Sequence, residues 1–312
     1  MRIDIAGIGR EPDRVSHADF LALMREIDQL GFDGIWFNEF HFQTPPQPYP
    51  SPLLLAASIF ASTQRLRVGT SVLVLPLHDP LLLAEQIEQL QWHSGGRFDA
   101  GFGRGTDPAT FEKLNIDVAS TRHRFERALL ALKASLPPAD NNSRQAIYLA
   151  GYTPETLAFA AEHSFPLLLS LEPPEGRQIE IYNAAIAAGQ YPTMLPESSL
   201  TRYVVIGRTD AEAESHLQAL LPLLQERRIF YAQRRGIARA DVAPIDRNAL
   251  LRDQMIMGDP QTCIRLIIKL RRTTGIGALR CVFNGNGVLT RQQTLSQMRL
   301  FSQTVLPSLR AV

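Results

Sequence analysis

The regular alternation of short apolar runs with longer segments of helical periodicity constrains this chain most strongly. Residues 67–75, RVGTSVLVL, are nearly all apolar, and such strands are covered on both faces. In residues 17–30 apolar side chains recur every three or four positions, which predicts a helix. Asp79 and Pro80 supply a helix cap and a first-turn proline for a later helix. The alternation therefore predicts a parallel sheet flanked by helices.

Strands are predicted at eight places along the chain. They are residues 2–6, 34–37, 67–75, 97–102, 147–150, 166–170, 202–206 and 278–283. Residues 234–254 are polar and are expected to be irregular. Alternating strands and helices without a linker favour one closed (β/α)8 TIM barrel, a single domain over residues 1–312. A doubly wound sheet is the alternative, because sequence alone does not exclude a reversal of strand order.

Composition removes several functional classes. The chain has 32 Lys and Arg against 31 Asp and Glu, so we expect no nucleic-acid partner. No apolar run approaches the roughly 18 residues of a membrane helix, and the first ten residues do not resemble a signal peptide. We therefore expect a cytoplasmic protein without a membrane partner. Cys263 and Cys281 are interpreted as core residues, and no His or Cys spacing indicates a metal site.

Candidate reactive groups follow the second strand, because barrel enzymes carry their chemistry at the carboxyl ends of strands. Glu39 and His41 place a carboxylate two residues from an imidazole, and such a pair can orient or tune a general acid or base. A hydrogen bond that only stabilises the loop explains the pair equally well.

Candidate anion-binding groups follow the fourth and fifth strands. Arg104 lies in a glycine-rich turn and could bind a phosphate, although a tight strand-to-helix turn is the alternative. Gly151, Tyr152 and Thr156 surround a predicted helix start, which is either an anion site or an ordinary cap. Arg122 begins the preceding helix and could add charge to the same anion or remain solvated.

Small residues interrupt the third strand at Thr70 and Ser71. They indicate a bulge or a place where a ligand approaches the backbone closely.

Four segments in this order resemble the bacterial luciferase-like flavin monooxygenases. They are GFDGIWFNEFHF, RLRVGTSVLVLPLHDPLLLAEQIEQL, SGGRFDAGFGRG and the closing GDPQTCIRLIIKL with FSQTVLPSLR. The likeness extends from Ile3 to Arg310. It implies a luciferase-like TIM barrel that binds flavin mononucleotide (FMN) at its carboxyl face.

The resemblance also implies roles for individual residues. Arg104 matches a phosphate-binding arginine, Arg122 matches a second arginine near the phosphate, and Gly151, Tyr152 and Thr156 fall in a phosphate loop. Tyr152 departs from the Ser or Thr usual there. Thr70 and Ser71 fall where relatives have a non-proline cis peptide beneath the isoalloxazine.

Three positions depart from luciferase itself. The catalytic histidine of the family motif is Phe40 here, the acidic partner of that histidine maps to Thr110, and a reactive cysteine is replaced by Gly103. Light emission from a long-chain aldehyde is therefore not expected.

The resemblance implies a monooxygenase that inserts one oxygen atom from O2 into a small organic substrate. A separate NAD(P)H:flavin reductase would supply reduced FMN, His41 with Glu39 would handle a proton, and the protein would form a homodimer. The pocket is expected to be walled by Phe37, Phe40, Phe42 and Leu75. A coenzyme F420-dependent oxidoreductase and a non-catalytic flavin-binding protein remain the alternatives.

Overall fold

Parallel β-strands form the centre of the molecule. The computed structural model describes residues 1–9, 15–43, 49–105, 107–137, 147–233 and 236–311. The strands in these ranges are β1 (Arg2–Ala6), β2 (Gly34–Phe37), β3 (Arg67–Thr70), β4 (Leu73–Val74), β5 (Phe98–Gly103), β6 (Ile147–Leu149), β7 (Leu168–Leu169), β8 (Ser199–Ile206), β9 (Met255–Gly258) and β10 (Ala278–Val282).

The strand pairings form a circuit. From β1 they run through β2, β3 and β5 to β6, and from β7 through β8 and β10 back to β1, all of them parallel. Between β6 and β7 a single bridge pairs Leu149 with Leu167, and the N–H of Leu149 donates to the carbonyl of Pro166. The α/β fold with a parallel sheet predicted from the sequence is confirmed, and these pairings are consistent with the predicted TIM barrel.

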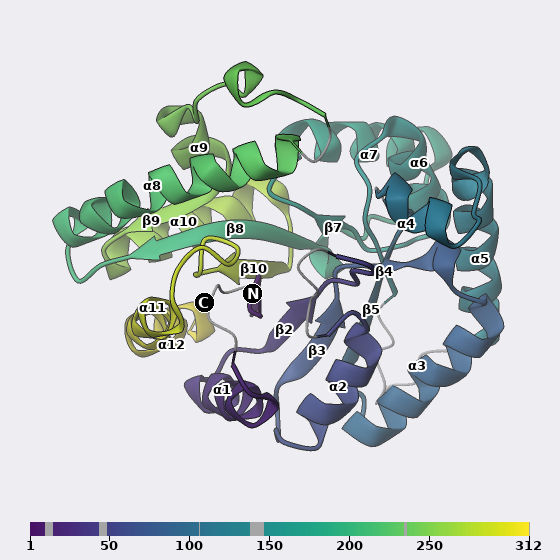
Figure 1. Cartoon of the computed structure of the whole chain (residues 1–312), viewed down its shortest axis with the longest axis horizontal. Helices are drawn as coiled ribbons and strands as arrows, with labels where there is room; N and C mark the ends of the chain where they lie inside the picture. The colour runs from purple at the N-terminus through teal and green to yellow at the C-terminus, as the bar shows by residue number, and fades with distance from the viewer. Residues whose placement is uncertain (10–14, 44–48, 106, 138–146, 234–235, 312) are drawn as a thin grey trace.

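Helices surround the strands on the outside (Figure 1). They are α1 (His17–Leu30), α2 (Pro52–Phe60), α3 (Pro80–Ser94), α4 (Pro108–Lys113), α5 (Thr121–Ser135), α6 (Pro154–Glu162), α7 (Glu175–Gly189), α8 (Asp210–Gln233), α9 (Arg247–Asp253), α10 (Pro260–Thr274), α11 (Arg291–Thr304) and α12 (Leu306–Arg310). None of the helices within the described ranges is long and apolar enough to span a membrane.

Local sequence accounts for several helix ends. The Asp79 carboxylate accepts hydrogen bonds from the N–H groups of Leu81 and Leu82, as the predicted cap requires. Gly31 ends α1 in the left-handed region at φ 83°, where glycine has no steric penalty.

The two faces of the strands differ in chemistry. Outward-facing residues such as Ile5, Ile35 and Val68 are fully buried against the helices and form the main apolar core. Alternate residues point into the circuit, and there the set includes Asp4, Trp36 and other polar side chains. The interior of the barrel is therefore partly polar, whereas the layer between the strands and the surrounding helices is apolar.

Two predicted elements differ from the structure, and one strand was not predicted. The strand expected over residues 67–75 is interrupted, because β3 ends at Thr70, β4 begins at Leu73 and the intervening Ser71–Val72 peptide is cis. Residues 234–254, expected to be irregular, contain α9, and β9 follows them unpredicted. β9 has only four residues. It pairs with the carboxyl-terminal half of β8, and this long-range contact is not revealed by the local sequence pattern.

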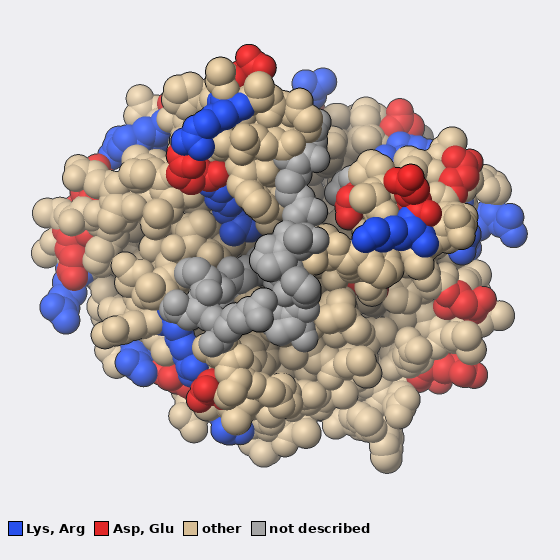
Figure 2. All heavy atoms as spheres, viewed as in Figure 1, with Lys and Arg blue, Asp and Glu red and all other residues tan. Residues whose placement is uncertain are grey.

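Acidic and basic residues are interspersed on the face shown in Figure 2. No extended field of one sign covers the described residues of that face, which agrees with the formal net charge of +1.

Candidate active site

A cavity of about 340 Å³ opens beside the carboxyl ends of β2, β5 and β6. Eight of the predicted site residues contribute to its wall: Glu39, Phe40, His41, Arg104, Arg122, Gly151, Tyr152 and Thr156. The folded chain thus brings together residues that are more than a hundred positions apart in sequence.

The carboxylate of Glu39 is the most constrained group of this cavity. Its residue is 6% exposed, and its Oε1 lies 2.9 Å from Nε2 of His41 and 2.9 Å from Nε2 of His78. The N–H of Val74 donates to Oε2 at 2.6 Å. These contacts hold the carboxylate between two imidazoles from different loops.

The environment of Glu39 favours its charged form. Burial raises the pKa of this carboxyl, but hydrogen bonding and charge from His78, the Val74 N–H and the hydrogen bond with His41 outweigh it. The net result is a pKa below the ordinary value of a glutamate.

His78 is a member of the site that sequence reasoning missed. No histidine spacing in the sequence indicated a ligand set, so no role in the site was predicted for His78. The available signal was its place immediately before the α3 cap, at the carboxyl side of the interrupted third strand, where its imidazole reaches Glu39.

The same cavity is also lined by groups that suit an anion. Nη2 of Arg122 donates to Oγ1 of Thr153 at 3.3 Å, and Thr153 is the N-cap of α6. Two carboxylates lie farther from this guanidinium, with Glu126 at 3.8 Å and Glu155 at 3.7 Å. Arg104 is exposed and has no ion-pair partner among the described residues.

Gly151 allows the backbone to approach α6 closely. A Cβ at this position would lie 2.4 Å from Cγ2 of Thr156. Two guanidinium groups, two threonine hydroxyls and the start of a helix therefore face one small volume. This donor set matches the requirements of a phosphate group.

A second cavity, of about 750 Å³, occupies the mouth of the strand circuit. Ser71, Thr201, Tyr203 and Arg280 contribute to its wall from the strand side, and α8 and residues 244–254 contribute from the other side. Asn38 and Ser170 line both cavities, and the Asn38 amide donates to the Ser71 carbonyl. The two cavities are therefore neighbours.

Two expected pocket walls belong to the core instead. Phe37 is 3% exposed and packs its ring 6.0 Å from that of Phe20, because it points outward while Trp36 points into the circuit. Leu75 is fully buried in the same apolar core. Neither residue lines either cavity.

Two further residues also lie away from the cavity walls. Phe42 is 52% exposed, and its ring centroid lies 5.1 Å from Nζ of Lys113. Thr70 is fully buried, and its hydroxyl exchanges hydrogen bonds of 2.8 and 3.0 Å with the backbone of Gly101. Neither is among the residues that line the cavities, so the predicted direct contacts of Phe42 and Thr70 with ligands are not supported.

The three positions that depart from luciferase lie together on the first cavity. Phe40, Gly103 and Thr110 all line it. A Cβ at Gly103 would lie 2.7 Å from Cγ2 of Val72, so the Val72 side chain would have to move to admit a larger residue. The Thr110 hydroxyl donates to the carboxylate of Asp107 at 2.8 Å, and Asp107 also faces the cavity.

A sequence profile of the luciferase-like monooxygenases matches residues 6–276, which is most of the chain. The chain belongs to the luciferase-like monooxygenase family. The alkanal monooxygenase alpha chain of Photorhabdus luminescens is 26% identical in an alignment that covers 92% of this chain and 90% of that protein.

Solved structures share the fold of this family member. Monooxygenase RslO1 from Streptomyces bottropensis superposes with a TM-score of 0.78 at 21% identity, covering 99% of this chain and 100% of that one. The oxygenating constituent of 3,6-diketocamphane monooxygenase from Pseudomonas putida, solved in complex with FMN, gives 0.74 at 19% identity and 98% coverage of both chains. The coenzyme F420-dependent tetrahydromethanopterin reductase of Methanopyrus kandleri gives 0.65 at 18% identity, covering 98% of this chain and 99% of that one.

Proposed function

We propose that this protein is a flavin-dependent monooxygenase that uses reduced FMN to insert one oxygen atom from O2 into a small organic substrate. The observation that carries the proposal is a single cavity lined both by groups that suit a phosphate and by the Glu39–His41 pair. Family membership supports the reaction class.

The residues present fit the phosphate of FMN. Arg104 and Arg122 supply positive charge, Thr156 supplies a hydroxyl, and the first turn of α6 supplies backbone N–H groups without helical partners. Gly151 and Tyr152 line the same end, and at Tyr152 we assign the contact to the backbone because its side chain is 58% exposed. Ser71 lines the neighbouring cavity, and we assign it to the ring system of the flavin.

His41 is the group that we assign to proton transfer. An ionised Glu39 accepts a hydrogen bond from Nε2 of His41, which leaves Nδ1 of the ring to exchange a proton with a reacting group. Glu39 fixes the orientation of this ring. Phe40, in the first cavity, contributes an apolar wall that reduces the access of water. Bound reduced FMN would supply the electrons that activate O2.

We propose that a separate NAD(P)H:flavin reductase supplies the reduced FMN.

We also propose that the active form is a homodimer. Leu81, Leu82 and Trp92 on α3 are 59%, 61% and 81% exposed, and Leu54 on the adjacent α2 is 75% exposed. This apolar surface supports pairing through α2 and α3. Light scattering coupled to gel filtration would find a mass near twice that of the chain if pairing occurs, and a monomer would contradict it.

The function is tested with photoreduced FMN. Purified protein is mixed anaerobically with photoreduced FMN and then with O2 in a stopped-flow instrument, and the flavin absorbance is followed. We expect the protein to slow the reoxidation of FMN relative to buffer. Reoxidation at the rate found in buffer would contradict the proposal.

The F420-dependent reductase with the same fold defines the competing assignment. Equilibrium dialysis against FMN and against F420 separates the two, because retention of F420 without FMN would favour hydride transfer without O2. A non-catalytic flavin-binding role is the third outcome. It would be favoured if FMN binds and the His41→Ala variant matches the wild type in every turnover assay.

A further inference from the structure

Arg280 is a buried cation at the floor of the second cavity. It lies in the middle of β10, is 4% exposed and lines the cavity at the mouth of the strand circuit. Its Nε donates to Oγ of Ser199 at 3.0 Å, and its Nη2 donates to the carbonyl of Leu169 at 2.7 Å. Nη1 has no hydrogen-bond partner among the described residues.

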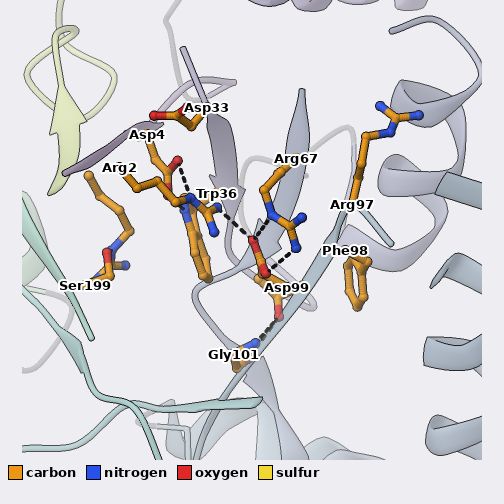
Figure 3. A network of polar contacts seen from close by, with 12 residues as sticks. Arg2, Asp4, Asp33, Trp36, Arg67, Arg97, Phe98, Asp99, Gly101 and Ser199 are labelled. Carbon is orange, nitrogen blue, oxygen red and sulfur yellow. Dashed lines mark hydrogen bonds and ion pairs between the residues drawn. The ribbon is translucent and has the colours of Figure 1, made fainter. Parts of the chain in front are cut away.

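The two carboxylates inside the strand circuit, Asp4 and Asp99, form ion pairs with Arg2 and Arg67 and not with Arg280 (Figure 3). Asp99 binds Arg67 at 2.7 Å and Nη2 of Arg2 at 2.7 Å. Asp4 accepts from Nε of Arg2 at 2.8 Å and from the indole N–H of Trp36 at 2.7 Å.

Arg280 is therefore the unpaired charge of this network. Two carboxylates face three guanidinium groups, and within the described ranges Arg280 has no ion-pair partner. Its Cζ lies 5.5 Å from the centroid of the Trp36 ring, within cation–π range, and the hydrogen bonds from Nε and Nη2 fix the plane of the guanidinium. Burial lowers the pKa of Arg280 to about 10, and Asp4 opposes this effect, so the group stays charged at neutral pH.

The remaining charged groups of the cavity wall are at its rim. Arg227 and Arg228 contribute positive charge from α8. The two acidic residues are Glu172, which accepts a hydrogen bond from the Gln254 amide at 3.0 Å, and Asp246, which caps α9. The acids are thus occupied by other donors, and the described wall retains an excess of positive charge.

We propose that the second cavity binds a substrate that carries a carboxylate, and that Arg280 holds this group. This inference rests on the proposed function and names the substrate class for it. A guanidinium whose plane is fixed offers directed N–H donors to a carboxylate, and a buried cation without an acidic partner is stabilised when an anion arrives. Arg280 is then a specificity-determining residue that decides which molecules enter the site.

The probe is 4-fluorobenzoate, with 4-fluorobenzamide as the neutral molecule of nearly equal shape. Their dissociation constants are measured by 19F NMR line broadening on the full-length protein, with and without FMN. We expect the wild type to bind the benzoate about tenfold or more tightly than the amide, as for a charged hydrogen bond. This comparison needs no variant. An equal or weaker affinity for the benzoate overturns the proposal.

Variants locate the anion within the cavity. Arg280→Met should abolish the preference for the benzoate, Arg280→Lys should retain part of it, and Arg252→Gln should leave it unchanged because Arg252 lies outside both cavities. Circular dichroism verifies that each variant folds. A preference that survives in folded Arg280→Met overturns the assignment.

The anion could instead belong to the cofactor, and FMN titration distinguishes the two sources. If Arg280→Met weakens FMN binding tenfold or more while the affinity for the benzoate is unchanged, the substrate assignment is overturned. If the wild type binds no FMN but prefers the benzoate through Arg280, the proposed function fails while the carboxylate site stands.

Discussion

Nε2 of His78 and Nε2 of His41 both lie 2.9 Å from Oε1 of Glu39, so one carboxylate oxygen serves two imidazoles. The histidines come from loops that follow different strands. Glu39 therefore joins the loop after β2 to the segment after β4, and it positions His41 on the cavity wall.

Replacement of this carboxylate should change the dependence of stability on pH. The folded-state pKa of Glu39 is lowered, so ionised Glu39 stabilises the fold above pH 4.5 and the contribution is lost as the pH falls through the lowered pKa. Glu39→Gln should cost about 1–3 kcal/mol at pH 7, because it leaves buried donors without their carboxylate. Urea unfolding at pH 7 and at acidic pH measures the difference, which should shrink in acid. The exposed Glu88→Gln should behave as the wild type, and a cost independent of pH would contradict this account.

Replacing either arginine proposed to hold the phosphate should cause a selective loss of FMN affinity. Arg104→Ala or Arg122→Ala should weaken FMN binding roughly 10- to 100-fold, because each removes a charged hydrogen bond to the phosphate. Riboflavin lacks the phosphate, so its affinity should not change. Quenching of flavin fluorescence measures both, with Arg25→Ala on α1 as the control. An equal loss for riboflavin would show that these arginines do not contact the phosphate.

The close approach of β5 to β3 makes Gly101 intolerant of a side chain. A Cβ there would lie 2.1 Å from the carbonyl oxygen of Thr70. Gly101→Ala should cost about 1–3 kcal/mol or more, since the two strands must separate. In Gly176→Ala the new Cβ meets nothing within 4 Å, so that variant is the matched control. Chemical denaturation compares them, and equal midpoints would refute the prediction.

The paired carboxylate inside the circuit should be important for stability. Asp99 is 1% exposed; burial raises its pKa, but the charge of Arg2 and the contacts with Arg67 outweigh this and lower it. Asp99→Asn should cost about 3 kcal/mol, because two partly buried guanidinium groups lose the buried carboxylate that pairs with both. Asp253→Asn removes a surface pair with Arg252 and should leave the urea midpoint unchanged. A similar, small effect of both variants would argue against this role.

Much of the fold was accessible from the sequence because its signals are local. The α3 cap at Asp79 and the glycine that ends α1 act within one helical turn. The barrel rule then places the loops after β2, β5 and β6 at one end. Together with the family resemblance, this rule assigned Glu39, His41, Arg104 and the residues that begin α6 to one site, and all of them line the first cavity.

The features that escaped prediction depend on long-range contacts. Trp36 and Phe37 look alike in the sequence, and only the register of β2 decides that Trp36 enters the circuit while Phe37 packs outward. His78 reaches Glu39 across 39 positions. Arg280 was not singled out, because whether an arginine has an acidic partner depends on strands from both halves of the chain.

The pairing of β1 with β10 affects how the chain can fold during synthesis. Arg2 lies opposite Ala278, and Ile5 lies opposite Cys281, so one edge of the first strand has no partner until the ribosome has added residues 278–282. An unpaired strand edge is a template for association with other chains. Until then the nascent protein carries a sheet with an unpaired edge at β1, which can associate with other chains.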